Sequence, residues 1–256
     1  MSSPTWTRVA LSSEFLRFEG SCWRLVEAQH RVSTLKLTDT LAEQALLEDL
    51  IEESKPRVPA ECRHLNFLLA TPFRYGALYP NGSRFRRAGR TAGVYYAAER
   101  VTTAMAEMAF YRLLFFSESP ATAWPSNAAE YTAFSAAVET TSLLDLTQDP
   151  LSKDAAIWTD LLAYEGCQAF AEAARNADAD VIRYQSVRDP AKGGNLAILL
   201  CRAFATPAPV DRQTWRMRLS ASGVRALCEF PQQALEFGRD VFASDPRIAS
   251  LNWDRR

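Results

Sequence analysis

The sequence predicts a single α+β domain over residues 1–256. Helical segments and short apolar segments typical of strands both occur, but they do not alternate strictly, which argues against a doubly wound α/β fold. The chain has 256 residues, of which 48% are hydrophobic and 23% charged, and this composition is typical of a globular protein with a sizeable core. No linker divides the chain, so we expect one domain.

The first clear element is an amphipathic surface helix over residues 39–53, which we expect to begin at Asp39 and to end near Pro56. Its predicted apolar stripe consists of Leu41, Ala45, Leu46 and Leu50. A short buried strand over residues 93–99 then leads into a helix over residues 101–116, with Thr102 or Thr103 as its N-cap. The later predicted elements are a strand at 138–146, a helix at 153–175, and strands at 180–185, 196–201 and 214–219.

The helix over residues 101–116 contains the most informative acidic residue. This helix is apolar nearly all round, which predicts that it is buried. Its charged residues are Glu107 and Arg112, which lie about 140° apart around the helix and cannot pair with each other. Glu107 therefore needs a partner from outside this helix. A structural ion pair or partial exposure is one interpretation, and a carboxylate held in a cleft for chemistry is the other.

Two segments are candidates for binding an anion. Residues 82–90 concentrate four arginines, Arg84, Arg86, Arg87 and Arg90, although the formal net charge of the chain is only −1. The loop at 186–195 has two glycines together with Ser186, Arg188 and Asn195, although an ordinary surface turn has a similar composition. Neither a GxGxxG nor a GxxxxGK[ST] motif occurs, so arginines would have to hold any dinucleotide.

The cysteines and histidines predict a reduced, cytoplasmic protein without a metal site. The five cysteines are Cys22, Cys62, Cys167, Cys201 and Cys228. They are scattered and odd in number, and only two histidines, His30 and His64, are present. The N-terminal residues lack the unbroken apolar stretch of a signal peptide, and no segment is apolar enough to span a membrane, so we expect no membrane association.

Four motifs in order resemble the RES domain family, the toxins of RES–Xre toxin–antitoxin modules. They are "WRLVEAQH", "GSRF" followed by "GVYYAAE", "TTAMAEMAFYR", and "YQSVRDPAKGGNLAILL", which together span residues 23 to about 204. The resemblance implies a fold similar to that of ADP-ribosyltransferases, with a mixed, largely antiparallel β core flanked by helices. The region up to about residue 70 would then be an N-terminal helical extension or insertion.

The resemblance also implies an activity and partners. Members of the family degrade NAD by phosphorolysis or hydrolysis of the nicotinamide–ribose bond, so we expect an enzyme resembling an NAD phosphorylase or glycohydrolase. NAD would be its substrate and not a bound cofactor, and inorganic phosphate is an expected co-substrate, with water or a protein side chain as other acceptors. The expected protein partners are a cognate Xre-type antitoxin and a second copy of the chain in a homodimer.

The resemblance assigns roles residue by residue. The first family arginine falls on Arg24, although "PFRYG" offers Arg74 and Tyr75 as rivals. The family's second arginine, glutamate and serine fall on Arg84, Glu107 and Ser186. The resemblance thus makes Glu107, Arg24 and Arg84 the expected catalytic residues. The expected NAD-binding residues are Arg74, Tyr75, Tyr96 and Ser186 from the family motifs, together with Arg188 and Asn195 from the donor-rich loop at 186–195.

These residue types fit the implied chemistry. A planar guanidinium can donate two parallel hydrogen bonds to a pyrophosphate, and an ionised Glu107 would stabilise the positive charge that develops on the ribose. The alternative function is a protein-binding or RNA-binding module, or an inactive one, that uses the basic 84–90 segment. The balanced charge of the chain provides little attraction to a polyanion, so direct nucleic-acid binding is not expected.

Overall fold

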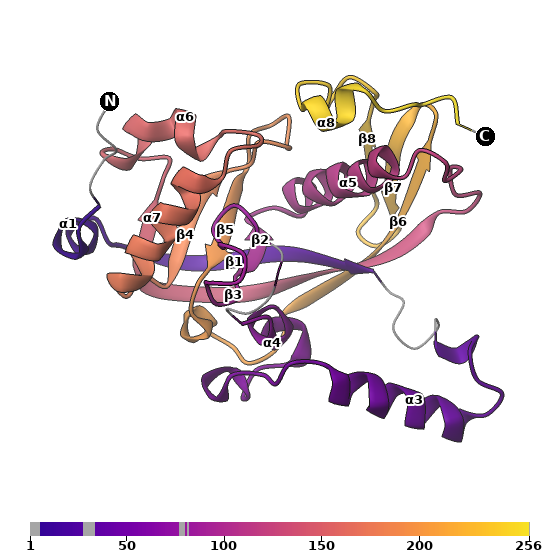
Figure 1. Ribbon diagram of the computed structural model, residues 1–256, viewed down its shortest axis with the longest axis horizontal. Helices are drawn as coiled ribbons and strands as arrows, with labels where there is room; N and C mark the ends of the chain where they lie inside the picture. The colour runs from indigo at the N-terminus through magenta and orange to yellow at the C-terminus, as the bar shows by residue number, and fades with distance from the viewer. Residues whose placement is uncertain (1–5, 28–33, 77–79, 81, 256) are drawn as a thin grey trace.

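The structure, a computed structural model, describes residues 6–27, 34–76, 80 and 82–255 (Figure 1). Its strands are β1 (Leu16–Glu27), β2 (Tyr95–Ala98), β3 (Ala129–Asp145), β4 (Val181–Gln185), β5 (Gly194–Ile198), β6 (Asp211–Ser220), β7 (Gly223–Cys228) and β8 (Gln233–Phe237). Its α-helices are α1 (Arg8–Ser13), α3 (Leu41–Ser54), α4 (Phe67–Arg74), α5 (Val101–Glu118), α6 (Ala155–Trp158), α7 (Glu165–Asn176) and α8 (Pro246–Ala249). Short 3-10 helices are η1 (Ala60–Cys62), η2 (Leu151–Asp154) and η3 (Cys201–Ala203).

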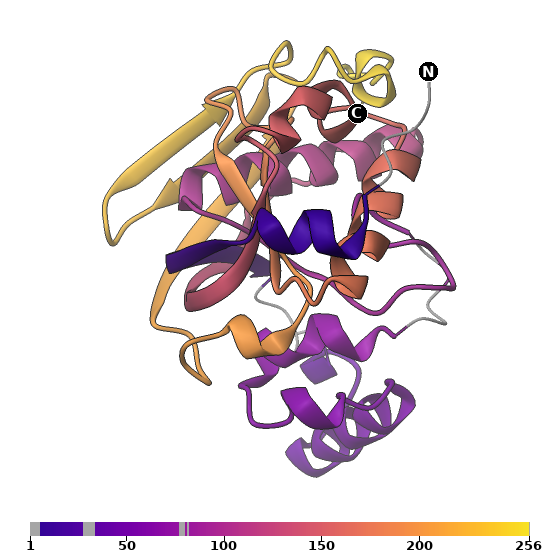
Figure 2. The same cartoon turned by 90° about the vertical axis from the view of Figure 1, so that its left-hand side faces the viewer.

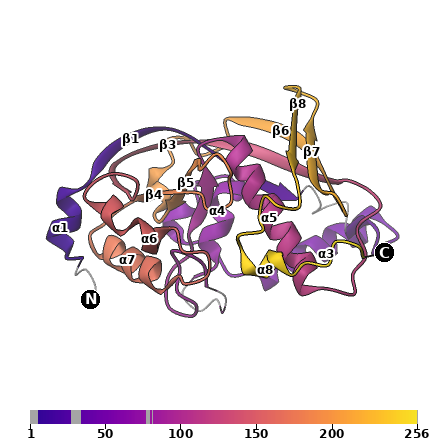
Figure 3. The same ribbon diagram turned by 90° about the horizontal axis from the view of Figure 1, so that it is seen from above.

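The strands of the described residues form one eight-stranded sheet in the order β1-β2-β5-β4-β3-β6-β7-β8. Because β1 pairs with both β2 and β3, the first five strands of this order close into a ring. Strands β6, β7 and β8 continue outward from β3 and turn away from the ring (Figure 3). Among the strands of the described residues, only β3 and β4 pair in parallel, so the expected α+β class with a largely antiparallel sheet is confirmed.

Three apolar clusters fill the space between the sheet and the helices. The first lies between α5 and strands β6–β8 and includes Phe110 and Trp215, both fully buried. The second packs α4, η1 and η3 against the closed part of the sheet, and the third packs α7 against β4. Helix α5 therefore has apolar neighbours along most of its surface, as the sequence predicts. No described helix is long and apolar enough to cross a membrane.

Helix α3 differs from its prediction in what it packs against. It begins at Leu41, two residues after the expected start at Asp39. A capping box precedes it, in which Thr40 Oγ1 accepts from the Glu43 amide and the Glu43 carboxylate accepts from the Thr40 amide. The predicted apolar stripe stays on the surface, since Leu41, Leu46 and Leu50 are 77%, 61% and 54% exposed. The helix lies at the outer edge of the molecule, beyond α4 (Figures 1 and 2).

Other sequence predictions also need correction. The helix expected over residues 153–175 is wrong as a single element, because the chain leaves the helical conformation after Trp158 and resumes it at Glu165. Helix α5 has Arg100 at its N-cap position, without a side-chain cap bond, and neither Thr102 nor Thr103 caps it. The region expected to be a helical extension contains β1, which belongs to the closed part of the sheet.

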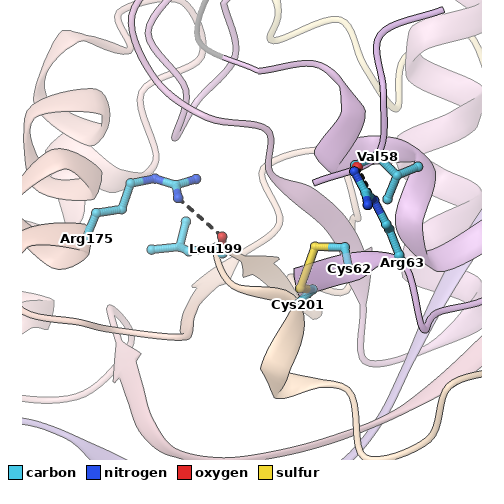
Figure 4. Close-up of a disulfide and its surroundings, with 6 residues drawn as sticks. All are labelled: Val58, Cys62, Arg63, Arg175, Leu199 and Cys201. Atoms are coloured by element: carbon cyan, nitrogen blue, oxygen red, sulfur yellow. Dashed lines mark hydrogen bonds between the residues drawn. A yellow bond between two sulfur atoms is a disulfide. The ribbon is translucent and has the colours of Figure 1, made fainter. Parts of the chain in front are cut away.

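The expectation that all five cysteines are reduced is wrong for one pair. Cys62 of η1 and Cys201 of η3 form a disulfide, with their Cα atoms 5.8 Å apart (Figure 4). The two residues are 139 positions apart in the sequence, so only the packing of η1 against η3 brings them together. Cys22, Cys167 and Cys228 are free and buried.

An ion-pair network ties three strands together beside the loop at 186–195. Arg183 of β4 donates from Nη1 to Asp145 Oδ2 at 3.0 Å and from Nη2 to Glu99 Oε2 at 3.1 Å. Asp145 ends β3 and its side chain is only 3% exposed, whereas Glu99 directly follows β2. The network therefore joins β2, β3 and β4 through one guanidinium.

We expect Arg183→Met to lower the free energy of unfolding by about 2 kcal/mol, because the buried Asp145 carboxylate loses its cationic partner. Urea denaturation measures this change. The control is Arg8→Met, which removes an ion pair to Asp178 whose two side chains are 69% and 65% exposed and which should leave stability nearly unchanged. Equal effects of the two substitutions would contradict the assigned role of Arg183.

Candidate active site

A cavity of about 310 Å³ opens between the closed part of the sheet and α5. This volume is at the lower end of the range for small-molecule sites. The charged and amide residues of its wall come from β1, the segment at 82–90, α5 and the loop region at 186–195. The lining residues are Trp23, Arg24, Leu25, Ser83, Arg84, Tyr96, Ala97, Ala98, Ala104, Glu107, Met108, Tyr111, Tyr164, Tyr184, Val187, Arg188 and Asn195.

Helix α5 presents Thr103, Glu107 and Tyr111 along one side, because residues four apart lie one above the other on a helix. The loop at 186–195 is fastened to this side. Thr103 Oγ1 donates to Asp189 Oδ2 at 2.7 Å, and Asp189 also accepts from the amides of Ala191 and Gly193. A Cβ at Gly193 would collide with Thr103 Oγ1, so this close approach requires glycine.

Glu107 is held through one of its two carboxylate oxygens. Its Oε1 accepts from Ser186 Oγ at 2.6 Å and from Asn195 Nδ2 at 2.8 Å. Its Oε2 accepts no hydrogen bond from any residue that the structure describes, and Glu107 lines the cavity. The arrangement therefore fixes the carboxylate and leaves one oxygen free for a ligand. The interpretation of Glu107 as part of an ion pair has no support, because its contacts are neutral hydrogen-bond donors.

Ser186 lies behind Glu107 and not on the cavity wall. Its Oγ accepts from the backbone amides of Arg188 at 3.2 Å and Asp189 at 3.0 Å. Because both lone pairs of the hydroxyl are used in this way, its proton is directed to Glu107. The serine is 1% exposed and acts as a positioning group, because its hydroxyl joins the loop backbone to the Glu107 carboxylate.

Arg84 lines the cavity, but its guanidinium is already engaged. Nη1 donates to the Trp158 carbonyl and Nη2 to the Asp160 carbonyl, both at 2.8 Å, and the group stacks 4.6 Å from the centre of the Tyr164 ring. These contacts hold the segment between α6 and α7 against the cavity. The fork that the sequence suggests for a pyrophosphate is therefore directed to backbone carbonyls.

Tyr96 of β2 positions both family arginines. Its hydroxyl is 2.8 Å from Ser83 Oγ and accepts from the Phe85 amide at 2.9 Å, so it holds the two residues that flank Arg84. Burial raises the pKa of Tyr96 to about 12, although the Ser83 hydrogen bond lowers it, so the hydroxyl keeps its proton at neutral pH. The Tyr96 carbonyl accepts from Arg24 Nη1 at 2.7 Å.

Arg24, on β1, lines the cavity, whereas its rival Arg74 does not. Arg74 ends α4 and pairs with Glu52 of α3, and Tyr75 is likewise absent from the cavity wall. Only Nη1 of Arg24 has a hydrogen bond to a described residue, so the rest of its guanidinium is available to a ligand. The geometry thus places Arg24 on the same cavity wall as Glu107 and places Arg74 elsewhere.

Sequence reasoning named Tyr96 but missed the other aromatic residues of the wall, which are Trp23, Tyr111, Tyr164 and Tyr184. Tyr111 could have been found, because it lies one helical turn after Glu107 on a helix already singled out. Tyr164 gave no such signal, since it lies in a segment predicted to be helical throughout. Flat aromatic side chains around a carboxylate suit a ligand with a planar ring.

The basic segment at 82–90 does not form an open cationic surface. Arg84 and Arg86 are buried, at 8% and 6% exposure. Arg87 and Arg90 both approach the Glu172 carboxylate, at 3.0 and 3.5 Å. This arrangement gives no support to a nucleic-acid interface at this segment. Among the described residues, no cluster of three or more His, Cys, Asp or Glu could hold a metal ion.

Comparison with known proteins identifies the family. The sequence profile of the RES domain matches residues 56–220, well over half of the chain. The chain belongs to the RES domain family. Within the RES domain match lie Arg84, Tyr96, Glu107 and Ser186, whereas Arg24 precedes it.

The crystal structure of the M. tuberculosis MbcT–MbcA toxin–antitoxin complex is similar at 13% identity and a TM-score of 0.46, over 95% of this RES domain chain and 98% of that chain. No curated protein matches the sequence.

We expect Arg84→Lys to accelerate backbone hydrogen exchange in the segment at 159–164, because one ammonium cannot replace two bonded nitrogens and a stacked planar group. Mass spectrometry of deuterium uptake measures the change. Arg87→Lys is the control, since Arg87 contacts the exposed side of α7 at Glu172. Unchanged exchange at 159–164 in Arg84→Lys would show that Arg84 does not hold this segment.

Proposed function

We propose that this RES domain protein cleaves the nicotinamide–ribose bond of NAD. The observation that carries the proposal is the carboxylate of Glu107, which is fixed through Oε1 while Oε2 stays without a described partner in an aromatic and cationic cavity. The family resemblance supplies the substrate, and the residue types around the cavity are those that the reaction needs.

The reaction places specific demands on the site. When the C–N bond breaks, its electron pair leaves with nicotinamide, which departs as a neutral molecule, and positive charge develops on the ribose. An ionised Glu107 stabilises that charge, and an acceptor oxygen then forms the new bond at the same ribose carbon. No general acid has to protonate the leaving group. A single carboxylate is therefore sufficient, in contrast to the pair that most glycosidases use.

The cavity wall supports binding of the rest of the substrate. Arg24 has unused donors for a phosphate oxygen, and the tyrosines can stack on a planar ring. Ser186 and Asn195 orient Glu107, and Arg84 holds the segment that carries Tyr164. Tyr96 fixes Arg24 and the residues around Arg84.

The test is incubation of the purified protein with NAD, with and without inorganic phosphate, followed by identification of the products. We expect release of nicotinamide, and the second product identifies the acceptor: ADP-ribose for water and ADP-ribose 1″-phosphate for phosphate. Incorporation of the ADP-ribosyl group into protein would indicate a side-chain acceptor. If NAD stays intact under all conditions, the proposed activity is wrong.

We expect Glu107→Gln to lower kcat about a hundredfold, because loss of the charge facing the developing cation costs on the order of 3 kcal/mol. The amide oxygen can still accept from Ser186 and Asn195, so folding and NAD affinity should be kept. Glu118→Gln, at the exposed end of the same helix, is the matched control. Full activity of a folded Glu107→Gln protein would remove Glu107 from the mechanism.

We also propose that the protein is the toxin of a toxin–antitoxin module, inhibited by an Xre-type antitoxin. Depletion of NAD would stop growth, so expression of the chain alone should arrest cells and lower their NAD content. Glu107→Gln should abolish the arrest, and Glu118→Gln should not. Growth counts and NAD assays after induction measure both effects. Normal growth with unchanged NAD during strong expression of the folded wild-type chain would contradict the toxin proposal.

A further inference from the structure

Arg188, which the sequence analysis counts among the expected NAD-binding residues, is a buried cation of the cavity wall, and the chemistry proposed above assigns it no specific contact. It follows Ser186 in the loop at 186–195, is 5% exposed, and lines the cavity. Its guanidinium lies 4.0 Å from the centre of the Phe110 ring of α5. This stacking fixes the plane of the group against the core.

The hydrogen bonds of Arg188 are incomplete. Nη2 is 3.4 Å from the Tyr164 hydroxyl and 3.5 Å from Asp245 Oδ2, whereas Nε and Nη1 are buried without a hydrogen-bond partner among the described residues. Burial of unsatisfied donors on a charged group costs free energy, so native proteins rarely retain them without a ligand or a function. Arg84, on the same wall, differs from Arg188 because both of its terminal nitrogens donate to backbone carbonyls.

The charge around Arg188 is also not balanced locally. Its acidic neighbour Asp245 is shared with Arg247, which donates from Nη2 at 2.6 Å and from Nε at 2.9 Å. One carboxylate thus serves two guanidinium groups. Among the residues that line the cavity, Glu107 is the acidic one, whereas Arg24, Arg84 and Arg188 are basic. The cavity wall therefore carries a surplus of positive charge.

We propose that Arg188 forms a binding subsite for the oxyanion of a phosphate group, and that Asp245 positions it. This inference rests on the proposed function for the identity of the ligand, but its observations are the two unused buried donors and the surplus charge. A phosphate oxygen would satisfy Nε or Nη1 with a charge-assisted hydrogen bond. The phosphate belongs either to NAD itself or to free inorganic phosphate that accepts the ribosyl group.

Asp245 reaches Arg188 from a distant part of the chain. It caps α8 by accepting from the Arg247 amide at 3.0 Å, and it lies outside the RES domain match at 56–220. Arg247 also donates to the Leu161 carbonyl at 3.2 Å, in the segment that carries Tyr164. The C-terminal segment thereby supports both groups next to Arg188 Nη2, which are the Tyr164 hydroxyl and the Asp245 carboxylate. Asp245 is a positioning residue, since it does not line the cavity.

Calorimetric titration of the Glu107→Gln protein tests the subsite without turnover, with NAD and inorganic phosphate as separate probes. We expect Arg188→Met in this background to lower the affinity for NAD, for inorganic phosphate or for both by about tenfold or more. Loss for NAD alone assigns the subsite to a phosphate of NAD, loss for inorganic phosphate alone assigns it to the acceptor, and loss for both means that the two compete for it. Unchanged binding of both probes, or no binding of either to the parent protein, overturns the proposal.

Two controls separate this outcome from misfolding and from failure of the proposed function. Arg218→Met removes one charge from the exposed face of β6 and should leave both affinities unchanged. If Arg188→Met does not fold, Arg188→Lys keeps the charge but not the planar donors, and it should still weaken binding of the phosphate probe. Arg188-dependent phosphate binding in a protein that leaves NAD intact would refute the proposed function and keep the subsite.

The positioning role of Asp245 is tested by combining it with the Arg188 substitution. When Arg188 is present, Asp245→Asn should lower the affinity for the affected probe several-fold. In the Arg188→Met protein, Asp245→Asn should have no further effect on that affinity. Equal effects of Asp245→Asn in both backgrounds would show that Asp245 only supports the fold. Thermal unfolding of each variant identifies any general loss of stability.

Discussion

The pair of hydrogen bonds that Ser186 and Asn195 donate to Glu107 Oε1 is the interaction on which the site depends. The two donors lie at opposite ends of one loop. Their hydrogen bonds to the same oxygen therefore hold the ends of the loop together and also fix the carboxylate. The second attachment, from Thr103 to Asp189, fastens the same loop one turn earlier on α5. Helix and loop thus form one rigid unit, with the remaining carboxylate oxygen directed away from both anchors.

The rest of the sheet serves to bring other groups to that oxygen. Closure of the ring by β1 places Arg24 beside Tyr96 of β2, whose backbone carbonyl fixes the guanidinium. The outer strands β6–β8 bury the opposite side of α5 and so prevent the helix from turning Glu107 away. Parts of the chain on both sides of the RES domain match therefore shape the cavity, Arg24 from before it and Asp245 from after it.

Sequence analysis predicted best those elements whose structure is determined by residues close together in the sequence. The apolar helix with one acid, the short strand before it and the polar loop at 186–195 could all be read from a few neighbouring residues. Long-range pairing gave no such signal: β1 was missed because its residues find their partners in β3, more than a hundred positions later. The Cys62–Cys201 disulfide and the break after Trp158 depend on the same kind of distant packing.

Two of the three arginines of the cavity wall, Arg84 and Arg188, show why residue type alone cannot assign a role. Arg84 carries the family motif, yet its terminal nitrogens are satisfied by the Trp158 and Asp160 carbonyls, and its contribution is the shape of the wall. Arg188 lies in a turn that sequence composition explains equally well as ordinary loop, yet two of its nitrogens are buried without partners. A satisfied guanidinium has little to gain from a ligand, whereas an unsatisfied one gains the bonds that burial has removed. The distribution of unused donors, and not the number of arginines, therefore indicates where we expect an anion to bind in this cavity.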